Sequence, residues 1–406
     1  MGSEVAGPLA DVMVVEMAVH RAGPFCGTLL ADMGADVVKI ERPGSGDPSR
    51  GIGPGPEGRS GYYIALNRGK RSVTLNLKTE AGRSAALDLI VDADVFIENF
   101  APGVAEKLGV GYEAVREVNE DLVYASIKGY GETGPLKDKK GLDLVTQAEG
   151  GIMSVTGPEG ADPVKVGTPV VDLGTGIFAT VAILARLYQR ERGRGPGGEN
   201  APDGASGKFD VGLLDTAVSL MNEYPTLYSL TGEVPGPQGV AHQTAVPYQS
   251  FETADGEVVT GVVSDRRWDD FVDLLGREEL REYPTNHDRA EHRDRVIEII
   301  QEEFAKEPTD YWIDRLTERG FPNAPLNDVA DLADYDQVRA RELVEEVKDP
   351  EAGETLVPGF PIRFPETDTS VSGSAPSLGD HTEEVFSEVA DDQTTLDRWV
   401  EGGAFD

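Results

Sequence analysis

The sequence predicts an α/β protein in which a large Rossmann-like domain, with a doubly wound and mostly parallel sheet, is joined to a smaller α/β domain. Residues 11–42 have the pattern of a strand, a helix and a second strand, and residues 72–100 repeat it. Another apolar strand, LVYASI, follows at 122–127. A chain of 406 residues is also long enough for two domains. Because strands that alternate with helices form mostly parallel sheets, these observations together indicate the doubly wound class.

The first two strand–helix–strand units supply the core of the predicted sheet. In the first unit, the strands DVMVVEM and ADVVKIER flank a helix that has Pro24 near its first turn. In the second unit, SVTLNL and DVFIENF flank a helix that runs from Thr79 to about Asp92. Ligands of such folds bind beyond the carboxyl ends of the strands. The candidate walls of a binding site are therefore the loops at 19–24, 42–50, 99–107 and 128–143.

A long apolar helix is predicted to begin near Asp172. Apolar residues occupy nearly all of its faces, so we expect it to be largely buried, with only its last turn in water. Asp172 lies at the junction of loop and helix, where free N–H groups and the helix dipole favour a carboxylate. Two interpretations are open: Asp172 caps the helix, or it is a nucleophile beside an oxyanion site. Gly174 and Gly176 would let another molecule approach the backbone closely.

The rest of the large domain, 1–231, consists of an insertion, a strand and a helix. Residues 193–207 contain glycine, proline and polar residues without an apolar anchor, which predicts a flexible surface insertion. The strand FDVGLL resumes directly after it, and a helix with a kink at Pro225 follows at 215–231.

The small domain, 232–330, begins with a predicted hairpin whose turn is Asp255-Gly256. Helical patterns follow at 266–275, 290–305 and 308–319. The tail, 331–406, is expected to complete the large domain by packing back on it. It is predicted to contain a helix at 335–346, the extended stretch LVPGFPIRFPE and a last amphipathic helix that begins near His381.

The net charge of the chain is −36, from 73 acidic and 37 basic residues. Acidic residues spread through a chain with only 12 lysines indicate a surface adapted to high salt, where screening suppresses self-repulsion. Such a surface repels phosphate backbones, which excludes a nucleic-acid partner. An anionic ligand would need a local basic pocket. There is no signal-peptide pattern and no run of about 18 apolar residues, so we expect a soluble, cytoplasmic protein without a membrane partner.

The sequence motifs do not indicate a disulfide framework, a metal site or a dinucleotide-binding site. The single cysteine, Cys26, excludes a disulfide framework, and it is either an activated thiol at a helix start or a small buried residue. The five histidines have no metal-ligand spacing, so we expect no metal and no permanently bound cofactor. The loop HRAGPFCG lacks the dinucleotide-binding glycine spacing, and the cation after Glu41 suits a phosphate better than a ribose hydroxyl.

Cations instead gather at the predicted strand ends. Each alone is compatible with an ordinary surface residue, but together they suggest a pocket for a polyphosphate such as that of coenzyme A. The residues are Arg42, Lys78, Lys107, Lys128 and Lys140.

Motifs over nearly the whole chain resemble the family III CoA-transferases, the formyl-CoA and carnitine CoA-transferase group. They include AGPFCGTLLADMGADVVKIERPGSGDPSR, ADVFIENFAPGVAEKLGVGYE, PVKVGTPVVDLGTG, PYQSFETADG and APSLGDHTEEVF, in the family's order. The resemblance implies an enzyme that uses a CoA thioester as substrate. It also implies an interlocked, ring-like homodimer.

The resemblance assigns roles to individual positions. It makes Asp172 the catalytic nucleophile and places the phosphate end of CoA near Arg42. The CoA-binding positions that it implies are Arg21, Ala22, Arg42, Leu75, Lys78, Asn99, Phe100, Ala101, Lys107, Lys140 and Asp143. Lys107 stands where members usually have arginine, so it keeps the charge without the planar fork. Gly239 and His242, in the segment GVAHQ, are the expected substrate-side residues and cover of the site.

At three places the sequence departs from patterns of known family members, and these departures reduce the number of reactions expected of the protein. Arg21 replaces a glutamine of formyl-CoA members, and GVAHQ replaces a glycine-rich loop, which argues against formyl or oxalate transfer. Leu142 stands where α-methylacyl-CoA racemases of this fold have a histidine, which disfavours a two-base racemisation. Arg21 and His242 are expected to pair with the second carboxylate of a dicarboxylic substrate. With the high-salt surface, this points to succinyl-CoA as donor and a C4–C5 dicarboxylate such as mesaconate as acceptor.

In the expected mechanism, Asp172 is ionised, its pKa is lowered by the helix start, and a backbone N–H at or near Gly174 stabilises the oxyanion. The alternatives are a racemase or epimerase of the same fold, a transferase for carnitine or another carboxylate, and a non-catalytic acyl-CoA binder in which Asp172 is only a cap.

Overall fold

The computed structural model describes residues 7–56, 59–194, 207–237, 239–367 and 373–406. The chain divides into two units. The first comprises 1–152, 166–226 and 336–406, and the second comprises 153–165 and 227–335. The second unit thus takes in 153–165, which the sequence analysis kept in the large domain. Most of the predicted insertion at 193–207 lies outside the described residues.

A six-stranded sheet forms the centre of the first unit, with the strand order β3-β2-β1-β4-β5-β6. All of its neighbouring strands are parallel, which confirms the predicted sheet. The order reverses between β1 and β4, and ligands of doubly wound sheets bind at such a switch point. The strands are β1 (Met13–Met17), β2 (Asp36–Glu41), β3 (Arg71–Thr74), β4 (Val95–Glu98), β5 (Val123–Lys128) and β6 (Lys208–Gly212).

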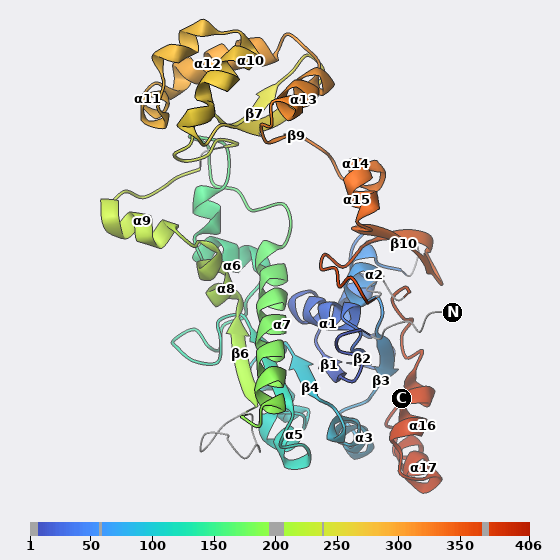
Figure 1. Ribbon diagram of the computed structural model, residues 1–406. Coiled ribbons are helices and arrows are strands. Elements are labelled where there is room, and N and C mark those ends of the chain that lie inside the picture. Colours follow the sequence, from blue (N-terminus) through green and yellow to red (C-terminus); the bar gives the residue numbers. More distant parts are fainter. Residues whose placement is uncertain (1–6, 57–58, 195–206, 238, 368–372) are drawn as a thin grey trace. The chain divides into compact units, whose positions relative to one another are not determined.

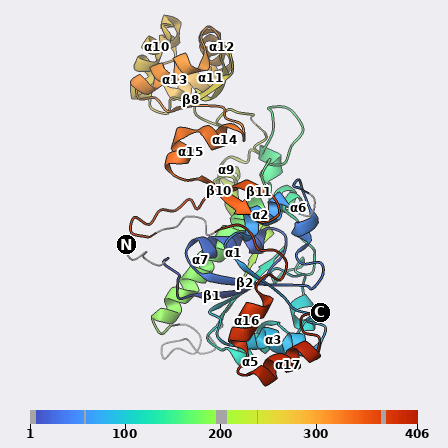
Figure 2. The same cartoon turned by 90° about the vertical axis from the view of Figure 1, so that its right-hand side faces the viewer.

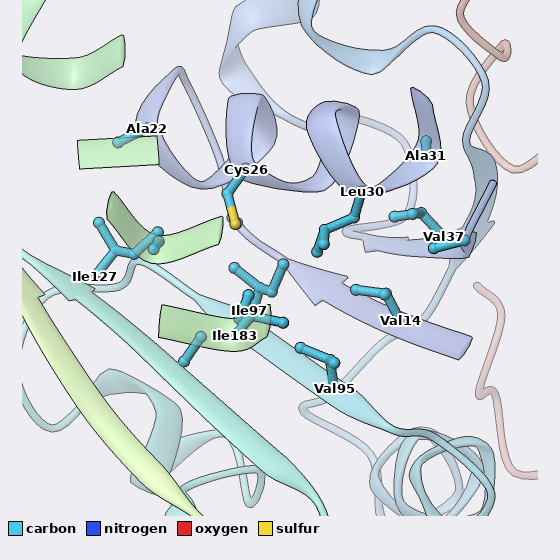
Figure 3. Close-up of a cluster of buried hydrophobic side chains, with 14 of the residues drawn as sticks. Val14, Ala22, Cys26, Leu30, Ala31, Val37, Val95, Ile97, Ile127 and Ile183 are labelled. Carbon is cyan, nitrogen blue, oxygen red and sulfur yellow. The ribbon is translucent and has the colours of Figure 1, made fainter. Parts of the chain in front are cut away.

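Helices cover both faces of this sheet (Figures 1 and 2). Successive strand residues point to opposite faces, so Val14 packs beneath α1 and α7 while Val15 packs on the side of α3. Figure 3 shows the first of these clusters, with Cys26 and Leu30 of α1 directed toward Val14 and Ile97 of the sheet. The helices of the two faces are α1 (Ala22–Asp32) and α7 (Val170–Glu191), then α3 (Glu80–Val91), α5 (Tyr112–Val118), α16 (Thr382–Val389) and α17 (Gln393–Glu401).

The end of the chain packs back on the first unit, as predicted, because α16 and α17 contact α3. Two other predictions for this unit are wrong. The helix expected at 335–346 ends at Ala340, because Glu342 has a positive φ of 48° and an alternating sequence then forms β10. The helix expected at 215–231 is two helices, separated where Asn222 has a φ of 43°. The elements concerned are α15 (Asp336–Ala340), β10 (Val344–Asp349), β11 (Gly353–Pro358), α8 (Leu213–Leu220) and α9 (Tyr224–Thr231).

The shorter helices of the first unit connect the strands, and α4 (Val104–Lys107) and α6 (Asp143–Glu149) follow the loops at the ends of β4 and β5. The others are α2 (Gly61–Asn67) and the 3₁₀ turn Pro48–Gly51, while the 3₁₀ turn Ile152–Val155 extends into the second unit.

The second unit has its own core, in which helices pack on a small antiparallel sheet. The predicted hairpin is confirmed, since β7 and β8 pair on either side of Asp255 and Gly256. The helix predicted at 290–305 is interrupted at His292. The elements are β7 (Tyr248–Glu252), β8 (Glu257–Gly261), β9 (Asn323–Pro325), α10 (Trp268–Leu275), α11 (Asn286–Glu291), α12 (Arg293–Phe304), α13 (Thr309–Glu318), α14 (Asp331–Asp334) and the 3₁₀ turns Asp265–Arg267 and Glu278–Glu282.

Helix α7 departs from its predicted burial. One face packs against α1 and β5, and Gly176 permits this because a Cβ there would lie 2.8 Å from the Ala22 carbonyl oxygen. The opposite face is exposed within the described chain. Its exposed apolar residues are Ile177 (48%), Phe178 (39%), Val181 (57%) and Tyr188 (61%). By length and composition alone α7 could cross a membrane, but its buried face makes it a core helix of this unit.

Candidate active site

Two adjoining pockets lie at the carboxyl ends of the parallel strands, where the order of the sheet reverses. The Arg42 pocket has a volume of about 490 Å³ and is lined by the ends of β1, β2 and β3. The Asp172 pocket, of about 500 Å³, is lined by the 19–22 loop, the end of β4, the 137–143 loop and Asp172. Val19 and Phe100 line both pockets, so the two pockets adjoin at these residues.

Most of the predicted site residues converge on these two pockets. Arg42, Leu75, Lys78 and Phe100 line the Arg42 pocket. The Asp172 pocket is lined by Arg21, Ala22, Asn99, Phe100, Ala101, Lys140, Asp143 and Asp172.

Three predicted residues are not placed in these pockets. Lys107 is exposed at the end of α4 and lines neither pocket among the described residues, although its neighbour Leu108 lines the Arg42 pocket. Gly239 and His242 belong to the second unit, so their role at the site stays a prediction. The His242 Nδ1 accepts the backbone N–H groups of Thr244 and Ala245, both at 3.1 Å.

Asp172 does not cap its helix. It is the third residue of α7, and the cap comes from Asp143 at the start of α6. Asp143 Oδ1 accepts the N–H groups of Val171 at 2.9 Å and of Asp172 at 3.2 Å. Its other oxygen accepts the Gln147 side-chain amide at 2.6 Å. The cap interpretation is therefore wrong, because a carboxylate 29 positions earlier in the sequence already takes the free N–H groups at the helix start.

The pKa of Asp172 is raised to about 7. Burial of the carboxyl group is the largest cause, the negative charge of Asp143 adds to it, and the positive charge of Arg21 partly offsets both. The expectation that the helix start would lower this pKa is thus wrong. The Asp172 carboxylate is the dominant form only above about pH 7, and carboxyl groups shifted this far gather at functional sites.

Comparison with known proteins identifies the family. Residues 9–382 match the profile of CoA-transferase family III. The chain belongs to this family. It is 40% identical over 400 residues to the succinyl-CoA:mesaconate CoA-transferase of Haloarcula marismortui, covering 96% of this chain and 98% of that protein. It is 36% identical to the succinyl-CoA:glutarate CoA-transferase of Homo sapiens, covering 94% and 86%.

The fold agrees with that of a solved member of the family. A crystal structure of a CaiB/BaiF family protein from Brucella suis superposes with a TM-score of 0.82 at 32% identity, covering 95% of this chain and all of that one. The protein is therefore a CoA-transferase of family III, which moves CoA between acyl-CoA thioesters and carboxylic acids.

The cations of this CoA-transferase divide into paired and open groups. Lys128 is paired, because its Nζ donates to both Glu98 oxygens at 2.6 and 2.7 Å and to the Phe100 carbonyl at 2.9 Å. It supports the pocket wall, and the Glu98 charge offsets its own. Lys137 and Lys140 are exposed at the Asp172 pocket, and Lys139 beside them pairs with Glu149. Lys140 was predicted from the sequence, whereas Lys137 and Lys139 were not, although three lysines within four residues stand out in a lysine-poor chain.

Cys26 is a small core residue of this enzyme. It is fully buried, and burial raises the pKa of its thiol to about 12. Its sulfur accepts a hydrogen bond at 3.4 Å from the hydroxyl of Thr180 on α7. The second of the two interpretations of Cys26 is confirmed, because such a thiol is not ionised at neutral pH.

The effect of Asp143 on Asp172 is testable by substitution. Asp143→Asn keeps an oxygen that can cap α7 and removes the negative charge beside Asp172. We expect the Asp172 pKa to fall below its value of about 7. A titration of ¹³C-labelled aspartate carboxyls by NMR measures this shift, with Asp172→Asn identifying the resonance. An unchanged or higher midpoint would show that Asp143 does not act on Asp172.

Proposed function

We propose that Asp172 is the nucleophile of this CoA-transferase. The observation that carries the proposal is the convergence of Asp172, Arg21 and the start of α1 in one pocket that adjoins the Arg42 pocket. An acyl-CoA bound with its phosphates near Arg42 and Lys78 would extend its thioester toward Asp172.

The proposed reaction proceeds by double displacement. The Asp172 carboxylate attacks the donor thioester carbonyl, the C–S bond breaks, and a mixed anhydride and CoA thiolate form. The thiolate attacks the aspartyl carbonyl of the anhydride, which releases the donor acid and leaves an aspartyl-CoA thioester. The acceptor carboxylate then attacks this thioester and expels the thiolate, which attacks the acceptor's carbonyl and regenerates Asp172. Because the Asp172 pKa is about 7, the attacking form predominates above that pH.

The oxyanion donors of this scheme lie at the start of α1 and not at Gly174. Gly174 is the fifth residue of α7, where the helical pattern engages the backbone N–H. Helix α1 begins at the pocket with Ala22, and its first turn has no side-chain cap. Free N–H groups at a helix start stabilise developing negative charge. We therefore assign the oxyanion site to the first turn of α1.

For the substrates we propose succinyl-CoA as donor and a C4–C5 dicarboxylate such as mesaconate as acceptor. The Asp172 pocket carries more positive charge than a substrate with one carboxylate would need, from Arg21, Lys137 and Lys140. The relatives named above act on succinyl-CoA with a dicarboxylic acid. The net charge of −36 supports activity at high salt. Leu142 lines the pocket where the racemases have their histidine, which favours transfer over racemisation.

We further propose that the enzyme is a homodimer. The exposed apolar face of α7 supports this, because an apolar helix face of this extent is usually covered by another molecule. A second copy of the chain fits the family resemblance.

Removal of the nucleophile tests the first proposal. Asp172→Asn keeps the shape of the side chain and removes the attacking oxygen, so we expect transfer to fall by about 10³-fold or more. The matched control is Asp32→Asn, which changes another buried carboxylate, at the far end of α1. Full transfer activity in Asp172→Asn would contradict the assignment.

A panel of carboxylic acids tests the substrates. With succinyl-CoA in several molar salt, we expect C4–C5 dicarboxylates to accept CoA at least about tenfold more efficiently than monocarboxylates of equal length, because one lost charge pair corresponds to about that factor. Preference for a monocarboxylate would contradict the proposed class. Deuterium incorporation at the α-carbon without CoA exchange would instead support a racemase.

A charge on the exposed face of α7 tests the homodimer. We expect Val181→Glu to shift the protein to monomers in analytical ultracentrifugation, because the interface would have to bury an unpaired charge. Val400→Glu on α17 is the matched control, since Val400 is 56% exposed and Val181 is 57% exposed. A Val181→Glu protein that stays dimeric would exclude this face as the interface.

A further inference from the structure

The loop between β1 and α1 carries Arg21 toward Asp172 in an uncommon backbone conformation. Val19 lines both pockets, and His20 and Arg21 line the Asp172 pocket. His20 has a φ of 66°, in the left-handed region that residues with a side chain seldom occupy. Such a conformation persists only where the surrounding contacts determine it.

Two side chains from other loops hold this segment. Asp47 Oδ1 accepts the His20 N–H at 3.2 Å. Asn99 Oδ1 accepts the Val19 N–H at 2.9 Å, and Asn99 Nδ2 donates to the Val19 carbonyl at 2.7 Å. The loop is therefore fixed on one side from the 42–50 loop and on the other from the end of β4.

Asp47 is in turn fixed by buried charges. It is 1% exposed, its Oδ1 also accepts the Ser49 N–H at 2.8 Å, and its Oδ2 lies 3.1 Å from Lys39 Nζ. Lys39 is completely buried and also bonds Glu16 at 2.8 Å and the Ala18 carbonyl at 2.6 Å. Glu16 completes the group by pairing with buried Lys70 at 2.7 Å.

This group is costly to bury, which argues for a role beyond stability. Its two carboxylates and two ammonium groups balance in charge, yet apolar side chains of similar volume often stabilise a fold as well as buried ion pairs do. Lys39 and Asp47 also line the Arg42 pocket. The same ion pair thus connects the wall of one pocket to the loop that carries Arg21 in the other.

We propose that Asp47 is a positioning residue of this transferase. Its carboxylate, held by Lys39, fixes the His20 peptide and so sets the Arg21 guanidinium beside Asp172. The guanidinium is also steadied from its other side, where it lies 4.4 Å from the centre of the Tyr62 ring. The inference rests on the proposed nucleophile, because a positioned Arg21 matters only if Asp172 reacts.

Two thioesters separate positioning from nucleotide binding. Succinyl-CoA occupies both pockets, whereas succinyl-N-acetylcysteamine lacks the nucleotide and cannot reach the Arg42 pocket. We expect Asp47→Ala to lower kcat by about tenfold or more with both thioesters, since a small displacement of a reacting group has effects of this size. Asp47→Asn keeps the acceptor for the His20 N–H and should retain most of that kcat. A loss confined to the KM for succinyl-CoA would overturn the proposal, because Asp47 would then only line the nucleotide pocket.

The pH profile adds a readout that a purely structural role would not move. Asp143 and Arg21 are the charged groups that act on Asp172. If Asp47→Ala displaces Arg21, the positive charge that lowers the Asp172 pKa is lost. The Asp172 pKa then rises, and the acidic limb of the kcat–pH profile moves to higher pH. The control is Asp32→Ala, which removes a buried carboxylate paired with Arg68 at the far end of α1 and should leave kcat and the limb unchanged. An unmoved limb in Asp47→Ala would overturn the proposal.

A second variant covers the case in which Asp47→Ala does not fold. Asn99 is half-buried, and Asn99→Ala releases Val19 from the other side of the loop. We expect the same lowered kcat with both thioesters, and an unchanged kcat would overturn the proposal. A wild-type protein without any transfer activity would refute the proposed function itself. An active wild type with an unchanged Asp47→Ala refutes only the positioning role.

Discussion

The arrangement of charges around the Asp172 carboxyl group is the constraint on which the rest of the site depends. Burial and the Asp143 carboxylate oppose ionisation of this group, and Arg21 favours it. The three groups come from the first turns of α7 and α6 and from the loop before α1, and they meet because the strand order reverses between β1 and β4. A nucleophile with a pKa near neutrality is ionised for part of the population and is weakly solvated when it attacks.

A separate set of charges, the cations that line the two pockets, reconciles a strongly acidic protein with an anionic substrate. A net charge of −36 repels an acyl-CoA at long range, and salt screens that repulsion. At short range the pockets present Arg42, Lys78, Lys137 and Lys140. The buried ion pairs do not add to this attraction, because Lys39 and Lys128 are already balanced by carboxylates. Open cations therefore line the surface of the pockets, and paired ones beneath them hold the walls.

Local sequence patterns predicted the strands of the six-stranded sheet, the first helices and the hairpin of the second unit, because period and turn chemistry are local. They failed where a distant contact decides the outcome. The cap of α7 by Asp143 spans 29 positions, and the half-burial of α7 depends on which of its faces α1 and β5 cover. Most residues that the family resemblance assigned to CoA line the two pockets, but Lys107 lines neither among the described residues, and no sequence spacing indicated that Asp47 contacts His20.

The central claim is that the Asp172 side chain becomes acylated during turnover. Its most direct measurement is to mix the protein with succinyl-CoA, quench with hydroxylamine and map the modified peptide by mass spectrometry. Our account predicts a hydroxamate on Asp172, absent from protein treated with hydroxylamine alone. Transfer of CoA that proceeds without any modification of Asp172, or with modification of another carboxylate, would contradict it.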